Sequence, residues 1–194
     1  MGLPDAYDVA AYEKALAKVA VGPMEAPLTG RIVVSNYDPE WPQRYEREAA
    51  RVRAALGDRV VRLEHVGSTS VPGLPAKPIV DIVLEVPDSA DEAAYVPDLE
   101  AAGYVLRGRE PDWFEHRLFK VSGSVNLHVF SAGCPEIDRM VRFRDHLRTS
   151  AADRDLYART KRDLAGRDWK YTQQYADAKT DVVGEIMRRA GTTG

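Results

Sequence analysis

A nearly unbroken apolar segment, IVDIVL from Ile79 to Leu84, places the strongest constraint on the fold. Successive side chains of a strand point to opposite faces, and this segment is apolar on both faces except at Asp81. Such a pattern is typical of a central strand in a sheet that is covered on both sides. A carboxylate buried there without a partner would be costly, so the pattern also favours a functional role for Asp81.

Small, turn-forming residues come just before this strand. Gly67 and Ser68 follow a β-branched run, and several prolines and a further glycine punctuate the connection up to residue 78. A glycine at a strand end lets the backbone approach a ligand closely, and amides beside Ser68 and Thr69 could hold a phosphate. Asp81, about one strand later, could hold a divalent cation that bridges such phosphates. The pattern indicates a nucleotide-handling site, although a Gly-Ser pair alone is more often a simple turn with a helix cap.

The remaining sequence predicts short strands and helices in a single domain. Ser89 and Glu92 form a capping box for a helix ending at Gly103, which Pro97 should kink or split. We expect an α+β fold with a mixed, mainly antiparallel sheet and a C-terminal helical layer. The expected strands are 31–35, 60–66, 78–86, 104–107, 113–121 and 125–130, and the expected helices are 42–56, 89–103 and several between 137 and the C-terminus.

Residues 1–30 stand apart from this domain, which we expect to span residues 31–194. A helix at 8–20 and a linker at 22–30 are predicted, and the helix should pack on the domain surface or against a second subunit, as in a homodimer.

Composition excludes several classes of protein. The chain of 194 residues is 44% apolar and 29% charged, which is ordinary for a globular protein. Its net charge of −3 gives no general attraction to nucleic acid. It has no apolar run near the ~20 residues that span a membrane, no signal-peptide pattern at its start, and one cysteine, Cys134. These features predict a cytoplasmic protein without an internal disulfide.

Four segments together resemble one known family. They are YDPEWPQRYEREAARVRAALG (37–57), GSTSVPGLPAKPIVDI (67–82), NLHVF (126–130) and RFRDHLR (142–148). Over about Ile32 to Ala190 the sequence is similar to the GrpB family, which is placed in the nucleotidyltransferase-like superfamily. The resemblance implies that fold, and the family's domain also occurs fused to dephospho-CoA kinase. It settles the fold better than the reaction.

The match to catalytic nucleotidyltransferases is incomplete. Those of the polymerase type carry a second acid two residues after the first, and two metal ions bound by such acids stabilise the attacking and leaving oxygens. Here that position is Val83. The next acid on the same face, Glu85, is ~13 Å further along, too far to share one ion with Asp81. One-metal chemistry or plain nucleotide binding therefore remains.

Several basic residues are candidates for neutralising phosphate charge. Lys77 lies at the start of the Asp81 strand, and Arg117 could clamp a phosphate, although solvation and a cross-strand ion pair are the plainer interpretations. Arg144 interrupts an apolar helix face and should pair with an acid or a ligand. Lys161 and Lys179 each follow a tyrosine by four residues on one helix face. Each lysine could cover its tyrosine ring at the surface, or the ring and the amine could contact a nucleotide. The resemblance favours the second interpretation for Lys161, Tyr175 and Lys179.

Two histidines on predicted strands are further candidates. His128 could take a proton from the acceptor, and His65 and His128 could join Asp81 around one cation, Mg²⁺ or alternatively Mn²⁺ or Zn²⁺. Strand histidines are more often structural, and the spacing matches no compact metal motif.

The leading hypothesis is an enzyme that binds a nucleoside triphosphate with a divalent cation and transfers a nucleotidyl or phosphoryl group to a small acceptor. An ATP-dependent ligase that activates a carboxylate fits the same residues. The alternative from another class is a catalytically inactive nucleotide- or coenzyme-binding module, which the valine at position 83 favours. A third is a scaffold that binds a protein and no nucleotide.

Overall fold

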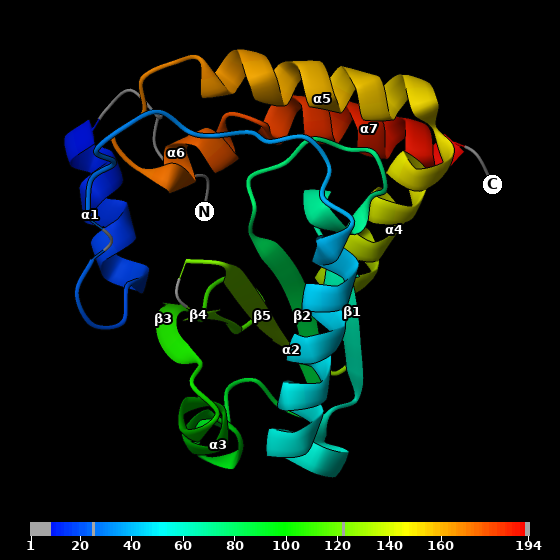
Figure 1. Ribbon diagram of the computed structural model, residues 1–194. Helices are drawn as coiled ribbons and strands as arrows, with labels where there is room; N and C mark the ends of the chain where they lie inside the picture. Colours follow the sequence, from blue (N-terminus) through cyan, green and yellow to red (C-terminus); the bar gives the residue numbers. More distant parts are fainter. Residues whose placement is uncertain (1–8, 25, 122, 193–194) are drawn as a thin grey trace.

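The computed structural model describes residues 9–24, 26–121 and 123–192, and its centre is a five-stranded mixed sheet (Figure 1). The strand order is β1-β2-β5-β4-β3. The β2–β5 pair is parallel and the other three pairs are antiparallel. The predicted central strand is confirmed, because β2 has a neighbour on each side. The strands are β1 (Arg62–Val66), β2 (Val80–Val86), β3 (Val105–Glu110), β4 (His116–Val121) and β5 (Val125–Ser131).

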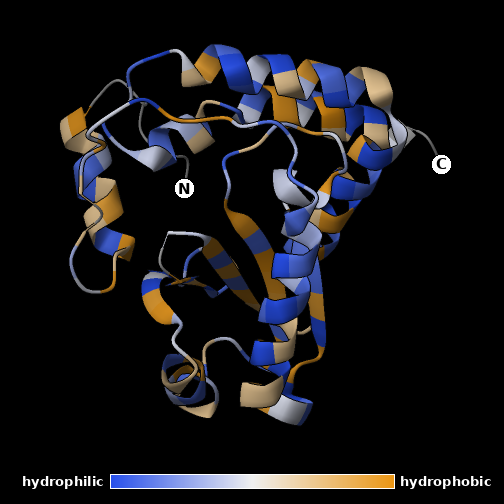
Figure 2. Ribbon diagram, in the orientation of Figure 1, coloured by the Kyte–Doolittle hydropathy of each residue, from blue (hydrophilic) through white to orange (hydrophobic). Residues whose placement is uncertain are grey.

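One face of the sheet packs on two helices and forms the main core. Helix α2 (Glu40–Leu56) follows a short turn and buries Val52 and Leu56 against this face, and α3 (Val96–Ala101) buries Leu99 there. The alternate residues of β2, Val80, Ile82, Leu84 and Val86, are fully buried in the same cluster. Figure 2 shows apolar residues gathered in β2 and β5, whereas polar and apolar residues alternate along the outer helices.

The opposite face of the sheet is only partly covered. Helix α4 (Pro135–Thr149) packs Ile137 on Val66, Val83 and Phe130. The layer formed by α5 (Ala151–Ala165), α6 (Thr172–Asp177) and α7 (Thr180–Thr192) lies beyond the strand ends, at the top of Figure 1. This layer packs on the connection between β1 and β2 through a second apolar cluster that includes Val71, Leu74 and Ile186. The predicted α+β class with a C-terminal helical layer is confirmed.

The N-terminal helix α1 (Val9–Val19) joins the sheet edge to the C-terminal layer. After it, the Val21 amide donates to the Arg107 carbonyl of β3 at 2.9 Å. The buried Tyr12 hydroxyl donates to Asp177 of α6, and the Tyr171 hydroxyl donates to Glu13 at 2.7 Å. Over its described residues this helix packs on the domain surface, one of the two arrangements expected for it, and residues 1–8 of the predicted N-terminal segment lie outside the described part of the chain.

Some local predictions need correction. The segment 31–35 is extended but pairs with the rest of the fold only through an isolated bridge between Ser35 and Ala76. The capping box is wrong, because the Ser89 hydroxyl donates to the Glu115 carbonyl at 2.8 Å instead of capping a helix. The expected helix at 89–103 is a 3₁₀ turn, Glu92–Ala94, followed by the six-residue α3 with Pro97 in its first turn. Two other 3₁₀ turns, Gly57–Arg59 and Ser68–Ser70, flank β1.

None of the helices within these described ranges is long and apolar enough to cross a membrane.

Candidate functional site

The β1–β2 turn lies directly against the Asp81 carboxylate. Antiparallel pairing places Val66 opposite Asp81, so the chain turns immediately beside the acid. Gly67 has φ 68° and ψ −172°, a conformation that essentially only glycine adopts. A Cβ at this position would lie 3.0 Å from the Asp81 Cγ and closer still to Oδ2. The predicted meeting of the glycine turn and the acid is what the structure shows, and glycine is required there on both grounds.

Asp81 is anchored by β5 and remains open to solvent. The parallel β2–β5 register sets Asp81 beside Asn126, whose Nδ2 donates to Oδ1 at 2.8 Å. The His128 Nε2 lies 3.9 Å from the same oxygen, and 29% of the Asp81 side chain is exposed. Burial opposes ionisation, but His128, Asn126 and the charge of Lys179 outweigh it and lower the pKa of Asp81. The group is therefore a carboxylate that a ligand can reach.

Two lysines of the C-terminal layer act electrostatically on this carboxylate. Lys161 of α5 is 2% exposed, donates to the Pro75 carbonyl and lies 4.7 Å above the centre of the Tyr157 ring. Burial and the neighbouring charge of Lys179 lower the pKa of Lys161 to about 6, although Asp81 opposes this. Lys179 lies 4.5 Å above the Tyr175 ring, and burial lowers its pKa against the opposing effect of Asp81.

Both Lys–Tyr pairs have the predicted geometry, and the lowered pKa of Lys161 lets it take up a proton when an anion binds beside the two amines.

The turn at residues 67–70 is held in place by α5 and α4. The Tyr157 hydroxyl hydrogen bonds to Ser68, and burial raises the pKa of Tyr157 to about 12 despite that bond. Arg148 of α4 donates to the Ser70 carbonyl from Nε at 3.1 Å and from Nη2 at 2.8 Å. Thr69 is 1% exposed and hydrogen bonds to His65 at 3.0 Å. The side chain of Thr69 therefore stabilises the turn and does not face the ligand space.

His65 lies on the other face of the sheet from Asp81 and His128. It pairs across from Ile82, and its ring stacks on Tyr45 of α2 with centroids 4.9 Å apart. Burial lowers the pKa of His65 to about 4 despite the charge of Asp81, so the ring is neutral. Within the described part of the chain, no three His, Cys, Asp or Glu side chains gather to hold a metal ion. The expectation that His65 joins the other two around one cation is therefore wrong, because strand alternation sends it to the opposite layer.

Both predicted phosphate-binding arginines lie in ion pairs. Arg117 of β4 faces the α3 side of the sheet, with Nε 2.6 Å from Glu92 and Nη1 3.1 Å from Glu115. Arg144 of α4 binds Glu64 at 2.8 Å and the His65 carbonyl at 2.9 Å, which ties β1 to α4. The structure does not bring either arginine to Asp81. Each pairs with acids of the protein, which is the plainer of its two interpretations.

Two other candidates have protein partners of their own. The Lys77 amine donates to Thr172 Oγ1 at 3.5 Å, near the start of α6. Glu85 is buried and accepts a hydrogen bond from the Gly133 amide at 2.8 Å. Val83, between Glu85 and Asp81, is fully buried under α4. On β2, therefore, neither Val83 nor Glu85 supplies a second ligand beside Asp81.

A row of hydrogen-bonded side chains behind His128 is the feature that sequence reasoning missed. The His128 Nδ1 lies 3.1 Å from His116 Nε2, and His116 Nδ1 lies 2.7 Å from Glu110 Oε2. Burial lowers the pKa of His116 more than Glu110 raises it. Alternation in β4 and β5 could have indicated a shared face, but only the strand register brings the two rings together.

The donor set suits a cation that arrives with its substrate. Asp81 supplies one carboxylate on the exposed side of the turn, beside the His128 Nε2. Magnesium is commonly held by one or two carboxylates together with substrate phosphates and waters. The residues present therefore fit Mg²⁺ bound as a nucleotide complex better than an ion held by protein ligands alone.

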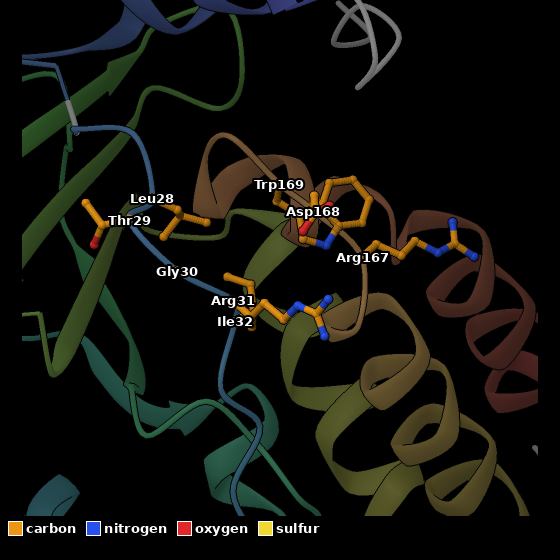
Figure 3. Close-up of a pocket in the computed structure, with 8 residues that line it drawn as sticks. All are labelled: Leu28, Thr29, Gly30, Arg31, Ile32, Arg167, Asp168 and Trp169. Atoms are coloured by element: carbon orange, nitrogen blue, oxygen red, sulfur yellow. The ribbon is translucent and has the colours of Figure 1, made fainter.

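A separate pocket of about 300 Å³ lies away from this site (Figure 3). It is formed by the extended segment Leu28–Ile32 and by the α5–α6 connection at Arg167–Trp169. None of its lining residues contacts Asp81, Gly67 or the two lysines in the hydrogen bonds and ion pairs described above.

The fold and site define an α+β protein with one accessible carboxylate beside a glycine turn, a buried lysine, Lys161, and a half-buried one, Lys179. The chain belongs to the GrpB family: residues 31–189 match the family model described as GrpB protein. A UPF0157 protein of Halalkalibacterium halodurans is 58% identical over 93% of each chain.

Two solved structures are also similar. The conserved protein GrpB from Enterococcus faecalis is 28% identical, with a TM-score of 0.71 over 81% of this chain and 96% of that chain. Cid1 in complex with the UTP analogue UMPNPP is 10% identical, with a TM-score of 0.40 over 77% of this chain and 44% of that chain. The first likeness agrees with the family membership, and the second is too weak to say anything of function.

Proposed function

We propose that the protein is a nucleotide-binding enzyme of nucleotidyltransferase-like fold. It transfers a nucleotidyl or phosphoryl group from a nucleoside triphosphate to a small acceptor. The observation that carries this proposal is the placement of one accessible carboxylate, Asp81, between the Gly67–Ser68 turn and the Lys161–Lys179 pair.

The two lysines support the choice of a phosphate ligand. Lys161 is nearly fully buried with one carbonyl partner, an arrangement that is unfavourable for an amine unless an anion compensates it. A bound triphosphate would restore the proton on Lys161, because an opposite charge nearby favours the charged form. Lys161 and Lys179 would therefore bind phosphate oxygens, with Tyr157 and Tyr175 as their supports.

Asp81 would hold a divalent cation that is carried by the triphosphate, Mg²⁺ first of all. Bound there, the ion would neutralise phosphate charge and polarise the phosphorus centre. Asn126 holds the Asp81 carboxylate in position through Oδ1 and leaves Oδ2 on the side of the glycine turn.

His128 would serve as the general base when the acceptor is an alcohol. Its Nε2 lies near the reacting face of Asp81. The acceptor oxygen would bond to phosphorus, the bond to the leaving phosphate or pyrophosphate would break, and the hydroxyl proton would pass to Nε2. A carboxylate acceptor, as in an ATP-dependent ligase, carries no proton and would not need this base.

The single carboxylate also favours a second candidate, a catalytically inactive nucleotide- or coenzyme-binding module. Val83 occupies the position of a second acid, has no ligating atom and is fully buried. Such a module would use the lysine pair and the turn in the same way without turnover.

Calorimetric titration with ATP, in the presence and absence of Mg²⁺, tests both candidates. For the enzyme, Mg²⁺ should tighten binding, and Asp81→Asn should remove roughly tenfold or more of that gain, about 1.4 kcal/mol. Asp168→Asn is the matched control, because this exposed acid lines the separate pocket of Figure 3. Binding that ignores both Mg²⁺ and the Asp81 substitution would favour the module. No binding of ATP, GTP, CTP or coenzyme A would refute both candidates and favour a protein-binding scaffold.

A further inference from the structure

Glu110, His116 and His128 form a continuous row of hydrogen bonds that ends at the reacting face of the site. Glu110 at the end of β3 pairs across from His116 at the start of β4, and Leu118 of β4 pairs with His128 of β5. The Glu110 Oε2 to His116 Nδ1 distance is 2.7 Å, and the His116 Nε2 to His128 Nδ1 distance is 3.1 Å. The remaining ring nitrogen, His128 Nε2, faces Asp81 at 3.9 Å.

The direction of each hydrogen bond follows from the first acceptor. A carboxylate oxygen of Glu110 can only accept, so the proton between it and His116 belongs to Nδ1. A neutral imidazole carries one proton, and burial favours the neutral ring for His116. His116 Nε2 is therefore an acceptor, and the proton in the second bond belongs to His128 Nδ1. His128 Nε2 is left facing the Asp81 carboxylate.

The surrounding packing fixes the His116 ring in this role. Its side chain is 3% exposed, it stacks on Phe130 with centroids 4.7 Å apart, and it makes a T-shaped pair with Trp113 with centroids 5.0 Å apart. The turn just before it holds Phe114 and Glu115 at φ 55° and 50°, a region that costs a non-glycine residue on the order of 1 kcal/mol or more. Backbone strain of this kind is concentrated at functional sites.

We propose that His116 and Glu110 are positioning residues that hold His128 with a proton on Nδ1 and with Nε2 directed toward Asp81 and the substrate. The inference rests on the proposed function for its purpose. When His128 Nε2 takes the proton of an acceptor hydroxyl, the resulting imidazolium donates from Nδ1 to His116, and the Glu110 carboxylate stabilises the positive charge through that ring. The group that activates the acceptor is thus set by residues that never contact it.

Nitrogen NMR of the imidazole rings tests the inference without any substrate. Two-bond ¹H–¹⁵N spectra distinguish a protonated ring nitrogen from a bare one for each of the four histidines, which single His→Gln variants assign. His116 should have a protonated Nδ1 and a bare Nε2, and His128 should have a protonated Nδ1. A His128 ring with a bare Nδ1 would overturn the proposal.

Variants at position 116 separate positioning from simple packing. His116→Phe keeps the stack on Phe130 but removes the acceptor of the His128 Nδ1 proton, so the His128 spectrum should shift toward a tautomer with a bare Nδ1. His116→Gln can donate to Glu110 and accept from His128, so it should restore the original tautomer. Glu115→Gln is the control, because this acid pairs with Arg117 and should leave the His128 spectrum unchanged. An unchanged His128 spectrum in a folded His116→Phe protein would refute the positioning role.

The same measurements keep the two proposals apart. The predicted tautomers with no affinity for any nucleotide would retain the row and refute the proposed function. Metal-dependent ATP binding with a bare His128 Nδ1 would do the reverse.

Discussion

Gly67→Ala tests whether the turn and the carboxylate are as close as the site requires. Two costs follow from the structure. The backbone at φ 68°, ψ −172° costs an L-residue ~1–3 kcal/mol. The new methyl group meets the Asp81 side chain, and relieving such overpacking typically costs a further ~1–3 kcal/mol. The free energy of unfolding should therefore fall by about 2–6 kcal/mol.

A double-mutant cycle isolates the contact from the strain. Asp81→Ala removes Cγ and both oxygens, so Gly67→Ala should cost about 1–3 kcal/mol less in that background than in the wild type. Urea denaturation of the four proteins measures this coupling directly. Gly73→Ala is the control, because Gly73 also has a positive φ, 77°, but nothing lies within 4 Å of a Cβ there.

Additive effects would refute the close approach of Gly67 to Asp81, and with it the proposed site. The same conclusion would follow if Gly67→Ala cost no more than Gly73→Ala.

Three further predictions concern buried ionisable groups. Lys161→Met should raise the free energy of unfolding at pH 7 by about 3 kcal/mol in urea denaturation and should weaken ATP binding. Folding deprotonates an amine whose pKa falls from 10.5 to about 6, and the lost bond to the Pro75 carbonyl offsets ~1–2 kcal/mol of the gain from removing it. A less stable variant would contradict this. The unfolded state protonates the His65 ring below pH 6.5, whereas the folded state does so only near pH 4. The free energy of unfolding should therefore fall by about 3 kcal/mol as the pH is lowered across that window, and His65→Asn should abolish this part of the pH profile. Glu85→Leu should leave the Gly133 amide without its acceptor and lower the thermal midpoint, at a cost of ~1–3 kcal/mol, whereas Glu100→Leu on the exposed side of α3 should shift it little.

The errors of sequence-based prediction have specific physical causes. Ser89 and Glu92 have the spacing of a capping box, but a tertiary partner, the Glu115 carbonyl, takes the serine hydroxyl. Phosphate binding by Arg117 is one interpretation of the sequence, because the predicted hairpin sets its strand across from Asn126 to His128. Strand alternation places its side chain on the α3 face with Glu92 instead.

At the site, residues that belong to local patterns could be predicted, and residues that depend on the strand register could not. Gly67 and Asp81 could be predicted because a glycine turn before a buried strand and a lone acid within it are local features. Asn126, His116 and Glu110 could not, because their contribution depends on which strands are neighbours. The parallel β2–β5 pairing and the antiparallel β3–β4–β5 pairings determine those neighbours.

By itself the sequence determined the central strand, the single carboxylate, the turn beside it and the helical periodicity that pairs each site lysine with a tyrosine. Each of these depends on a residue and its near neighbours along the chain, which a pattern can record. The tertiary structure alone decided which charges meet. It directed His65 and Arg117 away from Asp81, brought Lys161 and Lys179 toward it, and joined Glu110, His116 and His128 into one row. Long-range electrostatics and hydrogen bonds depend on distance in space, which the folded sheet sets and the order of residues does not.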